Sequence, residues 1–232
     1  MVKVTFSWDD GAVEDLKLAE LSAKYNIPAM FFIPGSNDER KVLSPREILL
    51  LNEFSIGSHT RSHSYLGSKS ENEAYSEMSE GKKYLEDITG RAIRHFCFPG
   101  GEYNDMLISL SEKLFISART ADTGMTKKSN FLIKPTFHFY DRGYNSLLFH
   151  SLRNDLKFFR YVIKALRTSE YFEKMKRILY NYLNKENEGF IMIWGHSWEI
   201  EKFGLWSKLD TLFKLLAEHF RENLVDYDSF IN

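Results

Sequence analysis

The stretch VKVTFSWDDG, residues 2–11, alternates apolar and polar side chains as far as Trp8 and then ends in two aspartates and a glycine. Alternation with a period of two is typical of a β-strand, and the glycine indicates a turn. Residues 13–25 follow with apolar side chains at helical spacing. The chain therefore begins as a strand, a turn and a helix.

The same unit recurs along the chain. Further strands are predicted at 29–33, 54–58, 93–98, 115–119 and 190–194, with one more short strand at 224–225. Helices are predicted from Ser44, which has the features of an N-cap, and at 72–89, 105–113 and 205–221, and the segment 152–186 is predicted to be largely helical. Alternating strands and helices predict a parallel sheet with helices outside it. Six or seven such units favour an α/β fold of the distorted (β/α) barrel type. Only 120–151 is irregular, and we expect a long loop or insertion there.

Composition excludes several classes of protein. The 232 residues, without repeat or linker, predict a single domain over 1–232. The net charge of −1, from 31 basic and 32 acidic side chains, gives no reason to expect a nucleic-acid or membrane partner. One cysteine excludes a disulfide framework, and with no signal peptide or apolar span we expect a cytoplasmic location. The basic side chains of Arg153, Lys157, Arg160 and Lys164 are interpreted as a solvated helix face. The oligomeric state stays open.

Unusual polar residues collect directly after predicted strands. They are Asp9 and Asp10, His59 with His63, Gly100, Arg119 and His196. In a parallel barrel the C-terminal ends of all strands meet on one face, which carries the active site. Residues far apart in the sequence are therefore predicted to converge there.

His59 and His63 lie four residues apart. If this segment turns helically, both rings lie on one side and can reach one cation. Two histidines and a carboxylate with one open position describe a catalytic zinc-type site. One of the two aspartates could then bind the cation while the other acts as a general base. The alternative is that one of them only caps a helix.

Three of these blocks resemble motifs of the polysaccharide deacetylases, also called the NodB-homology domain or carbohydrate esterase family 4. They are TFSWDDG at 5–11, HTRSH at 59–63 and FCFPGG at 96–101, and IMIWGH at 191–196 is similar to the fifth motif. The resemblance implies a distorted (β/α) barrel that hydrolyses N-acetyl groups of a carbohydrate. It also implies one divalent cation, with Zn²⁺ first and Co²⁺, Ni²⁺ or Mn²⁺ as alternatives.

Carried over by position, the resemblance implies a role for each matching residue. Asp9 would be the catalytic base and His196 the general acid. Asp10, His59 and His63 would hold the metal. The backbone N–H of Gly100 would help to bind the oxyanion, at the place where the family usually has a tyrosine. From the residues alone, Trp198 could stack on a sugar ring or pack against a helix, and Glu199 could orient His196.

The chain departs from the family at two motifs. Cys97 stands where the third motif has an arginine that pairs with the base, and the fourth motif has no clear match. Arg119 could replace that arginine, because it follows a strand and its planar fork can bind a carboxylate. Arg94 and Arg142 are weaker candidates, and Arg119 could instead be a surface residue.

Two other functions stay open at this level. One is hydrolysis of another C–N bond, such as a cyclic amide. The other is a catalytically silent domain that binds sugar or metal.

Overall fold

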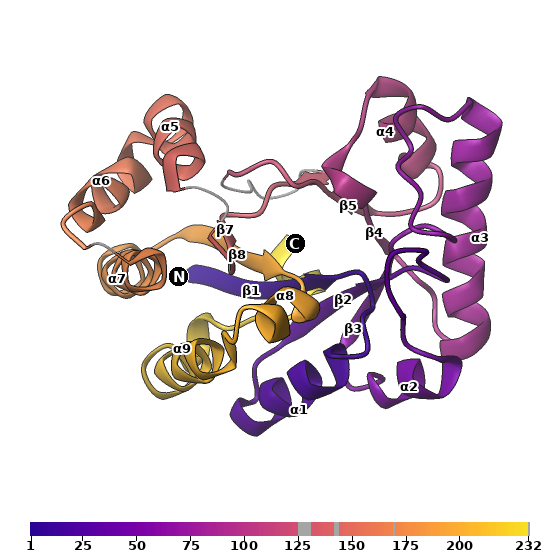
Figure 1. Cartoon of the computed structure of the whole chain (residues 1–232). Coiled ribbons are helices and arrows are strands. Elements are labelled where there is room, and N and C mark those ends of the chain that lie inside the picture. Colours follow the sequence, from indigo (N-terminus) through magenta and orange to yellow (C-terminus); the bar gives the residue numbers. More distant parts are fainter. Residues whose placement is uncertain (125–130, 142–143, 169, 232) are drawn as a thin grey trace.

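The computed structural model describes residues 1–124, 131–141, 144–168 and 170–231. Its centre is one sheet of eight parallel strands in the order β6-β5-β4-β3-β2-β1-β8-β7 (Figure 1). The strands are β1 (Val2–Asp9), β2 (Ala29–Ile33), β3 (Ser55–Ser58), β4 (His95–Cys97), β5 (Ser117–Arg119), β6 (Leu132–Ile133), β7 (Phe137–His138) and β8 (Gly189–Gly195).

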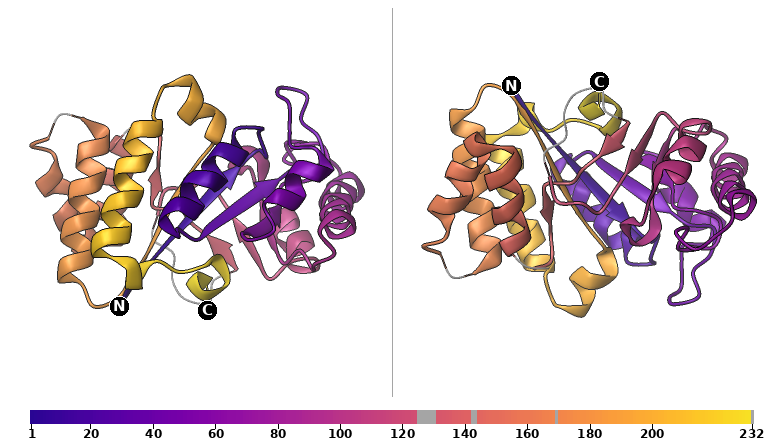
Figure 2. Two further views of the ribbon diagram at one scale, coloured as in Figure 1. Left: turned by 90° about the horizontal axis from the view of Figure 1, so that it is seen from below. Right: turned by 90° about the horizontal axis from the view of Figure 1, so that it is seen from above.

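Helices surround this sheet (Figure 1). They are α1 (Asp15–Tyr25), α2 (Pro45–Leu50), α3 (Glu71–Thr89), α4 (Asp105–Glu112), α5 (Tyr144–Asn154), α6 (Leu156–Ala165), α7 (Tyr171–Lys185), α8 (Ser197–Lys202), α9 (Trp206–His219) and α10 (Tyr227–Ile231), with 3₁₀ turns η1 (Pro99–Gly101) and η2 (Arg221–Asn223). Most of them lie on its outside, and α8 and α10 lie at its two ends (Figure 2). The predicted N-cap is confirmed, because the Ser44 side chain accepts a hydrogen bond from the backbone N–H of Glu47.

One extended segment, 131–139, joins the two edges of the sheet. Near its start it pairs with β5, where the N–H of Thr120 donates to the carbonyl of Ile133 at 3.0 Å. Near its end it pairs with β8, where the N–H of Phe139 donates to the carbonyl of Trp194 at 2.7 Å. The sheet is thereby closed through a strand that changes partner, and the prediction of a distorted parallel barrel is confirmed.

The two faces of β1 enter different environments. Val4, Phe6 and Trp8 belong to the main core between sheet and helices. Asp9 has the opposite orientation because side chains alternate along a strand. Its neighbour in register on β2 is Phe32, which belongs to a second buried cluster inside the sheet, closed by Tyr227 and Phe230 of α10. Figure 2 shows α10 at the end of the barrel opposite α8.

The prediction that residues 152–186 are largely helical is confirmed, since they comprise the end of α5, α6 and α7. Asp155 ends one helix and caps the next by accepting from the N–H of Phe158 at 2.8 Å. The segment 120–151 is not only a loop, since it contains β6, β7 and part of α5. Two-residue strands are too short to produce a recognisable period.

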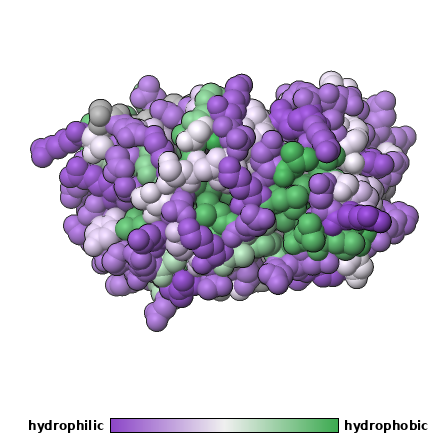
Figure 3. Space-filling model, turned by 60° about the horizontal axis from the view of Figure 1, so that its bottom comes forward, coloured by the Kyte–Doolittle hydropathy of each residue, from purple (hydrophilic) through white to green (hydrophobic). Residues whose placement is uncertain are grey.

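The predicted strand at 224–225 is reduced to one parallel bridge between Leu224 and Val4. The lower face of the molecule is mostly hydrophilic, with hydrophobic residues gathered toward its right-hand half (Figure 3). No helix in the described ranges is long and apolar enough to cross a bilayer.

Candidate active site

The polar strand ends converge on one cleft of about 230 Å³ at the carboxyl end of the barrel. Its lining includes Asp9, Asp10, His59, His63, Arg119 and His196. Gly100 and Trp198 also line it. The common location that the strand order implied is therefore observed for all seven strand-end residues, and Trp198 joins them there. Which task each performs stays a prediction.

Asp10, His59 and His63 form a compact group of possible metal ligands. Nε2 of His63 lies 2.9 Å from Oδ1 of Asp10, and Nε2 of His59 lies 3.5 Å from the same oxygen. The other ring nitrogen of His59, Nδ1, donates to the carbonyl of Cys97 at 2.8 Å. In a neutral ring this leaves a lone pair on Nε2, and a lone pair facing a carboxylate oxygen needs a positive charge between them, either a proton or a metal ion.

The titration behaviour fits that donor set. Burial lowers the pKa of His59, which favours the neutral ring that a metal requires. Burial acts to raise the pKa of Asp10, but hydrogen bonds with His59 and His63 outweigh it and hold the pKa well below its usual range. Asp10 is therefore ionised and faces Nε2 of both histidines, and a divalent cation bound there would take the place of the protons that these contacts need.

The two histidines are brought together by an irregular loop and not by a helical turn, so that part of the spacing argument was wrong. Thr60 and His63 have positive φ angles of 67° and 54°. Glu77 on α3 holds the loop by accepting hydrogen bonds from the N–H groups of residues 61 and 62. A Cβ at Gly81 would lie 2.6 Å from the carbonyl oxygen of Thr60, so only glycine lets α3 approach this closely. The two rings end 5.0 Å apart, centroid to centroid.

The second oxygen of Asp10, Oδ2, is held by two donors. Nε1 of Trp198 donates to it at 2.9 Å, and Nη1 of Arg40 at 2.7 Å. The Arg40 guanidinium also lies over the Trp198 ring, 4.0 Å from its centroid. Arg40 therefore covers one face of the Trp198 ring. Trp198 has two roles in the structure, because it donates a hydrogen bond to Asp10 and also lines the cleft.

Asp9 faces Arg119 inside the barrel. Nη2 of Arg119 contacts Oδ2 of Asp9, and both side chains are almost completely buried. The guanidinium stacks on Trp194, 4.4 Å from the ring centroid. The contact expected from the sequence is therefore present. Cys97 adds only a weak contact, with Sγ 3.8 Å from Oδ2 of Asp9.

The other two arginines do not fill this place. Arg94 forms an ion pair with Asp228 at the opposite end of the barrel. Arg142 lies outside the described residues.

His196 is coupled to a buried carboxylate. Its Nδ1 lies 2.6 Å from Oε2 of Glu199, and Nε2 of His138 lies 3.3 Å from the same oxygen. Burial lowers the pKa of His196, although the Glu199 hydrogen bond acts in the opposite direction. Burial acts to raise the pKa of Glu199, but hydrogen bonds with His138 and His196 bring it well below its usual range. The other nitrogen of His196, Nε2, points into the cleft, 3.9 Å from Asp10.

Gly100 occupies a turn that excludes side chains. Its φ angle is 64°, and a Cβ there would lie 2.4 Å from the ring of Tyr65. This is the position where the resemblance led us to expect an oxyanion donor. The tight turn brings the backbone of Gly100 to the cleft wall without an intervening side chain.

Sequence reasoning missed Arg40, Tyr65 and His138. All three follow a strand: Arg40 lies in the loop after β2, Tyr65 in the loop after β3, and His138 ends β7. The strand-end rule that identified the other residues could have found them. What hid them was the length of the two loops and the brevity of β7.

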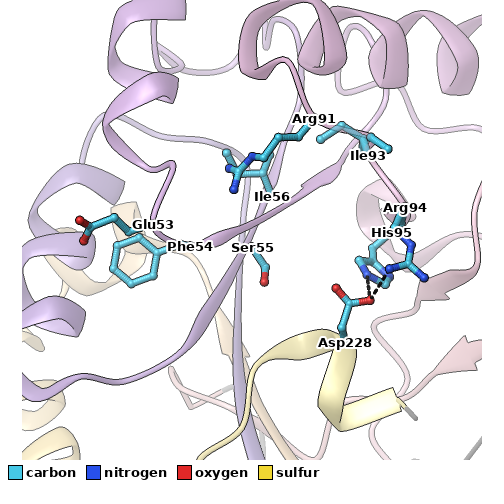
Figure 4. A pocket seen from close by; sticks show the side chains of 10 residues that line it. Glu53, Phe54, Ser55, Ile56, Arg91, Ile93, Arg94, His95 and Asp228 are labelled. Carbon is cyan, nitrogen blue, oxygen red and sulfur yellow. Dashed lines mark hydrogen bonds and ion pairs between the residues drawn. The ribbon is translucent and has the colours of Figure 1, made fainter.

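A second cavity, of about 270 Å³, lies at the other end of β3 and β4 (Figure 4). Arg94 and His95 both face Asp228 there, at 3.3 and 3.2 Å. Arg91 donates to the backbone carbonyl and the side chain of Asn52. Asp228 thus compensates the charge of Arg94, whereas Asn52 is neutral and only accepts hydrogen bonds from Arg91.

Comparisons with known proteins indicate the family and the fold. The family model described as polysaccharide deacetylase matches residues 2–118. No curated protein matches the chain. Among solved structures, a polysaccharide deacetylase from Bacillus cereus is 22% identical, with a TM-score of 0.51 over 56% of this chain and 45% of that one. The chain thus spans about half the length of that relative.

Two further structures cover almost the whole chain. A peptidoglycan N-acetylglucosamine deacetylase is 18% identical, with a TM-score of 0.60 over 99% of this chain and 87% of that one. A carbohydrate esterase family 4 pseudoenzyme from Bacillus anthracis is 14% identical, with a TM-score of 0.59 over 99% of this chain and 65% of that one. At such identities the likeness concerns the fold.

Proposed function

The chain belongs to the polysaccharide deacetylase family, and on this premise we propose that it is a metal-dependent hydrolase that removes the acetyl group from an N-acetylated sugar. The observation that carries the proposal is a pair of adjacent carboxylates with different surroundings. Asp10 faces two histidines, whereas Asp9 faces Arg119. A binding site needs only the first of these carboxylates, and hydrolysis needs both.

Asp10, His59 and His63 would hold the cation, and two imidazoles with one carboxylate are a donor set suited to Zn²⁺. Co²⁺, Ni²⁺ and Mn²⁺ are the alternatives. When bound, the cation would polarise the acetyl carbonyl and lower the pKa of the attacking water.

Asp9 would take the proton of that water. Its Oδ2 is engaged by Arg119, while Oδ1 is buried and has no hydrogen-bond partner among the described residues. That oxygen is the acceptor the reaction requires. The N–H of Gly100 would stabilise the negative charge on the carbonyl oxygen. Nε2 of His196 would protonate the departing amine, with Glu199 holding the ring through Nδ1.

Two other functions are tested by the same assay. A hydrolase of another C–N bond would release product from a cyclic amide but no acetate from N-acetylated sugars. A silent domain would bind sugar without turnover, and the likeness to a pseudoenzyme fold makes this comparison necessary. We expect acetate release from one or more members of a panel of N-acetylated monosaccharides and oligosaccharides, dependent on added Zn²⁺. Sugar binding without acetate release would favour the silent domain.

We predict that one divalent cation binds per chain and that His59→Ala and His63→Ala each weaken its binding by more than about 100-fold. Losing an outer partner of a metal ligand typically costs 10–100-fold, and losing a ligand should cost more. Metal stoichiometry and calorimetric titration with Zn²⁺ measure this. The exposed His219 provides the matched control, since His219→Ala should keep the metal. Full retention by both ligand variants would contradict the site.

We predict that Glu199→Gln moves the alkaline limb of the pH–rate profile to lower pH. A general acid must be protonated, so activity falls as the pH rises through its pKa. The Glu199 hydrogen bond raises the pKa of His196, and its loss therefore brings that fall to lower pH. His196→Ala should lose this limb and roughly 10²–10⁴ in turnover.

The control for this prediction is Glu201→Gln. Glu201 is on the same helix, α8, but is exposed and bound to Trp206 and Lys17. Its profile should match that of the wild type. An unchanged limb in both His196→Ala and Glu199→Gln would show that His196 is not the acid.

A further inference from the structure

The outer faces of α5 and α6 carry apolar and basic side chains together. Five large apolar side chains are exposed there, and Phe149 and Leu156 are each 64% exposed. The five are Phe149, Leu152, Leu156, Ile163 and Leu166. With Arg160, Lys164 and Arg167 they form what we call the α5–α6 surface. Isolated exposed apolar residues are ordinary, but five on two consecutive helices require an explanation.

The orientation of α6 is fixed by its inner face. Phe158, Val162 and Ala165 are buried. The Phe158 ring packs between Phe137 of β7, at 6.0 Å, and Tyr182 of α7, at 5.3 Å, between centroids. Figure 1 shows α5 and α6 as the outermost helices on this side of the barrel. The opposite face of α6 therefore points away from the protein.

That outward face is divided into two adjoining stripes. With about 100° of rotation per residue, Leu156 and Ile163 project on one side of the outward direction, and Arg160 and Lys164 project on the other. Leu166 and Arg167 follow in the turn directly after the helix. An apolar stripe beside a basic one is the pattern of helices that lie in a membrane interface.

The charge of this region differs from that of the whole chain. Residues 144–168 contain five basic side chains and one acidic one, a local charge of +4, whereas the chain as a whole carries −1. Lys157 is paired with Glu186 at 2.5 Å. Arg160, Lys164 and Arg167 form no ion pair with any described residue within 4.0 Å. Glu186 interacts with the charge of Arg160 only at longer range, so all three side chains can face an outside partner.

We propose that the α5–α6 surface docks on an anionic lipid bilayer. The apolar stripe would enter the boundary between headgroups and acyl chains, and the basic stripe would face the lipid phosphates. A solvated helix accounts for the charges but leaves the apolar stripe in water. The phosphates of a nucleic acid would pair with the basic side chains, but a nucleic acid offers little apolar surface on which the apolar stripe could be buried. The net charge of the whole chain gave no reason to expect a membrane partner. It could not indicate one, because a sum over the chain hides the local excess of positive charge in residues 144–168.

The test is sedimentation with vesicles of phosphatidylcholine alone and with one third phosphatidylglycerol, at about 0.05 M and about 0.5 M salt. We expect the protein to bind only the anionic vesicles and to be released by salt. Each basic side chain near an anionic surface contributes roughly fivefold to partitioning. Arg160→Gln/Lys164→Gln should therefore weaken binding about 25-fold. Leu156→Ser/Ile163→Ser should weaken it as well.

The matched control is Leu49→Ser/Leu50→Ser on α2. These leucines are 44% and 69% exposed, close to the 46% of Ile163 and 64% of Leu156, but they lie outside the α5–α6 surface. This variant should bind as the wild type does, and thermal unfolding of every variant checks that it folds. Absence of vesicle binding by the wild type overturns the proposal, as does equal loss in the control. Self-association of the wild type that only Leu156→Ser/Ile163→Ser abolishes would also overturn the proposal, because the α5–α6 surface would then join two copies of the chain.

Discussion

Asp9→Asn is expected to abolish deacetylation, by roughly 10²–10⁴ or more in turnover, while the protein keeps its metal. The reason is geometric. Asp9 lies on the inner face of β1 against Arg119 and does not face the two histidines. The asparagine preserves the shape and one hydrogen-bond acceptor toward Arg119 but cannot accept a proton from water at neutral pH.

Asp10→Asn provides the comparison, because the two residues are adjacent and the substitution is the same. Asp10 faces His59 and His63 through one oxygen and Trp198 and Arg40 through the other. Its replacement should therefore lose metal and activity together. Acetate release and metal content are measured on the same preparations. If Asp9→Asn loses the metal while Asp10→Asn keeps it, the two assignments are reversed.

Arg119→Ala is expected to have the next largest effect, on activity and on stability. It would leave the buried Asp9 without its cation, and breaking a buried pair in this way costs about 3–5 kcal/mol. For a chain of this size that corresponds to a fall in Tm of roughly 6–20 °C. A carboxylate without its cation holds its proton to higher pH. The acid limb of the pH–rate profile should therefore move upward.

The pH profile separates this role from a merely structural one, since packing defects alone do not move it. Arg119→Lys should recover part of the stability but less of the activity. A lysine cannot bind Asp9 and the carbonyl of Thr120 at once, as Arg119 does. Arg94→Ala is the control, because Arg94 is about half exposed and pairs with Asp228 far from the cleft. An Arg119→Ala protein with the wild-type profile would contradict the role.

The sequence was sufficient for whatever follows from periodicity and chain order. Alternation in residues 2–9 places Asp9 opposite Val4, Phe6 and Trp8, and the structure has it on the inner face. Parallel strands end on the same side, so residues as distant as Asp9 and Arg119 were expected in one place. That contact crosses the barrel, since β5 and β1 are separated by three strands. The sequence could predict this contact because each residue is the last of its strand and its side chain points to the inside of the barrel.

The sequence could not predict how the loops fold. The spacing of His59 and His63 suggested a helical turn, but the rings meet through left-handed residues and a hydrogen-bonded glutamate from α3. Positive φ angles at Thr60 and His63 are not encoded by residue type, because non-glycine residues seldom adopt them and a β-branched threonine disfavours them. Packing of α3 against the loop stabilises them. The three side chains do converge, as the sequence predicted, but the helical turn given as the local reason was wrong.

The surroundings of Asp10 were decided by tertiary structure alone. Strand β1 lies between β2 and β8 in the sheet. The loop after β2 brings Arg40 to Oδ2 of Asp10, and the helix after β8 brings Trp198 to the same oxygen. These residues are 30 and 188 positions away from Asp10. Local pattern determines which way a side chain faces from its own strand. Which two strands are the neighbours of β1 depends on how the whole sheet closes. That closure therefore determines that Arg40 and Trp198 are the two donors to the Asp10 carboxylate.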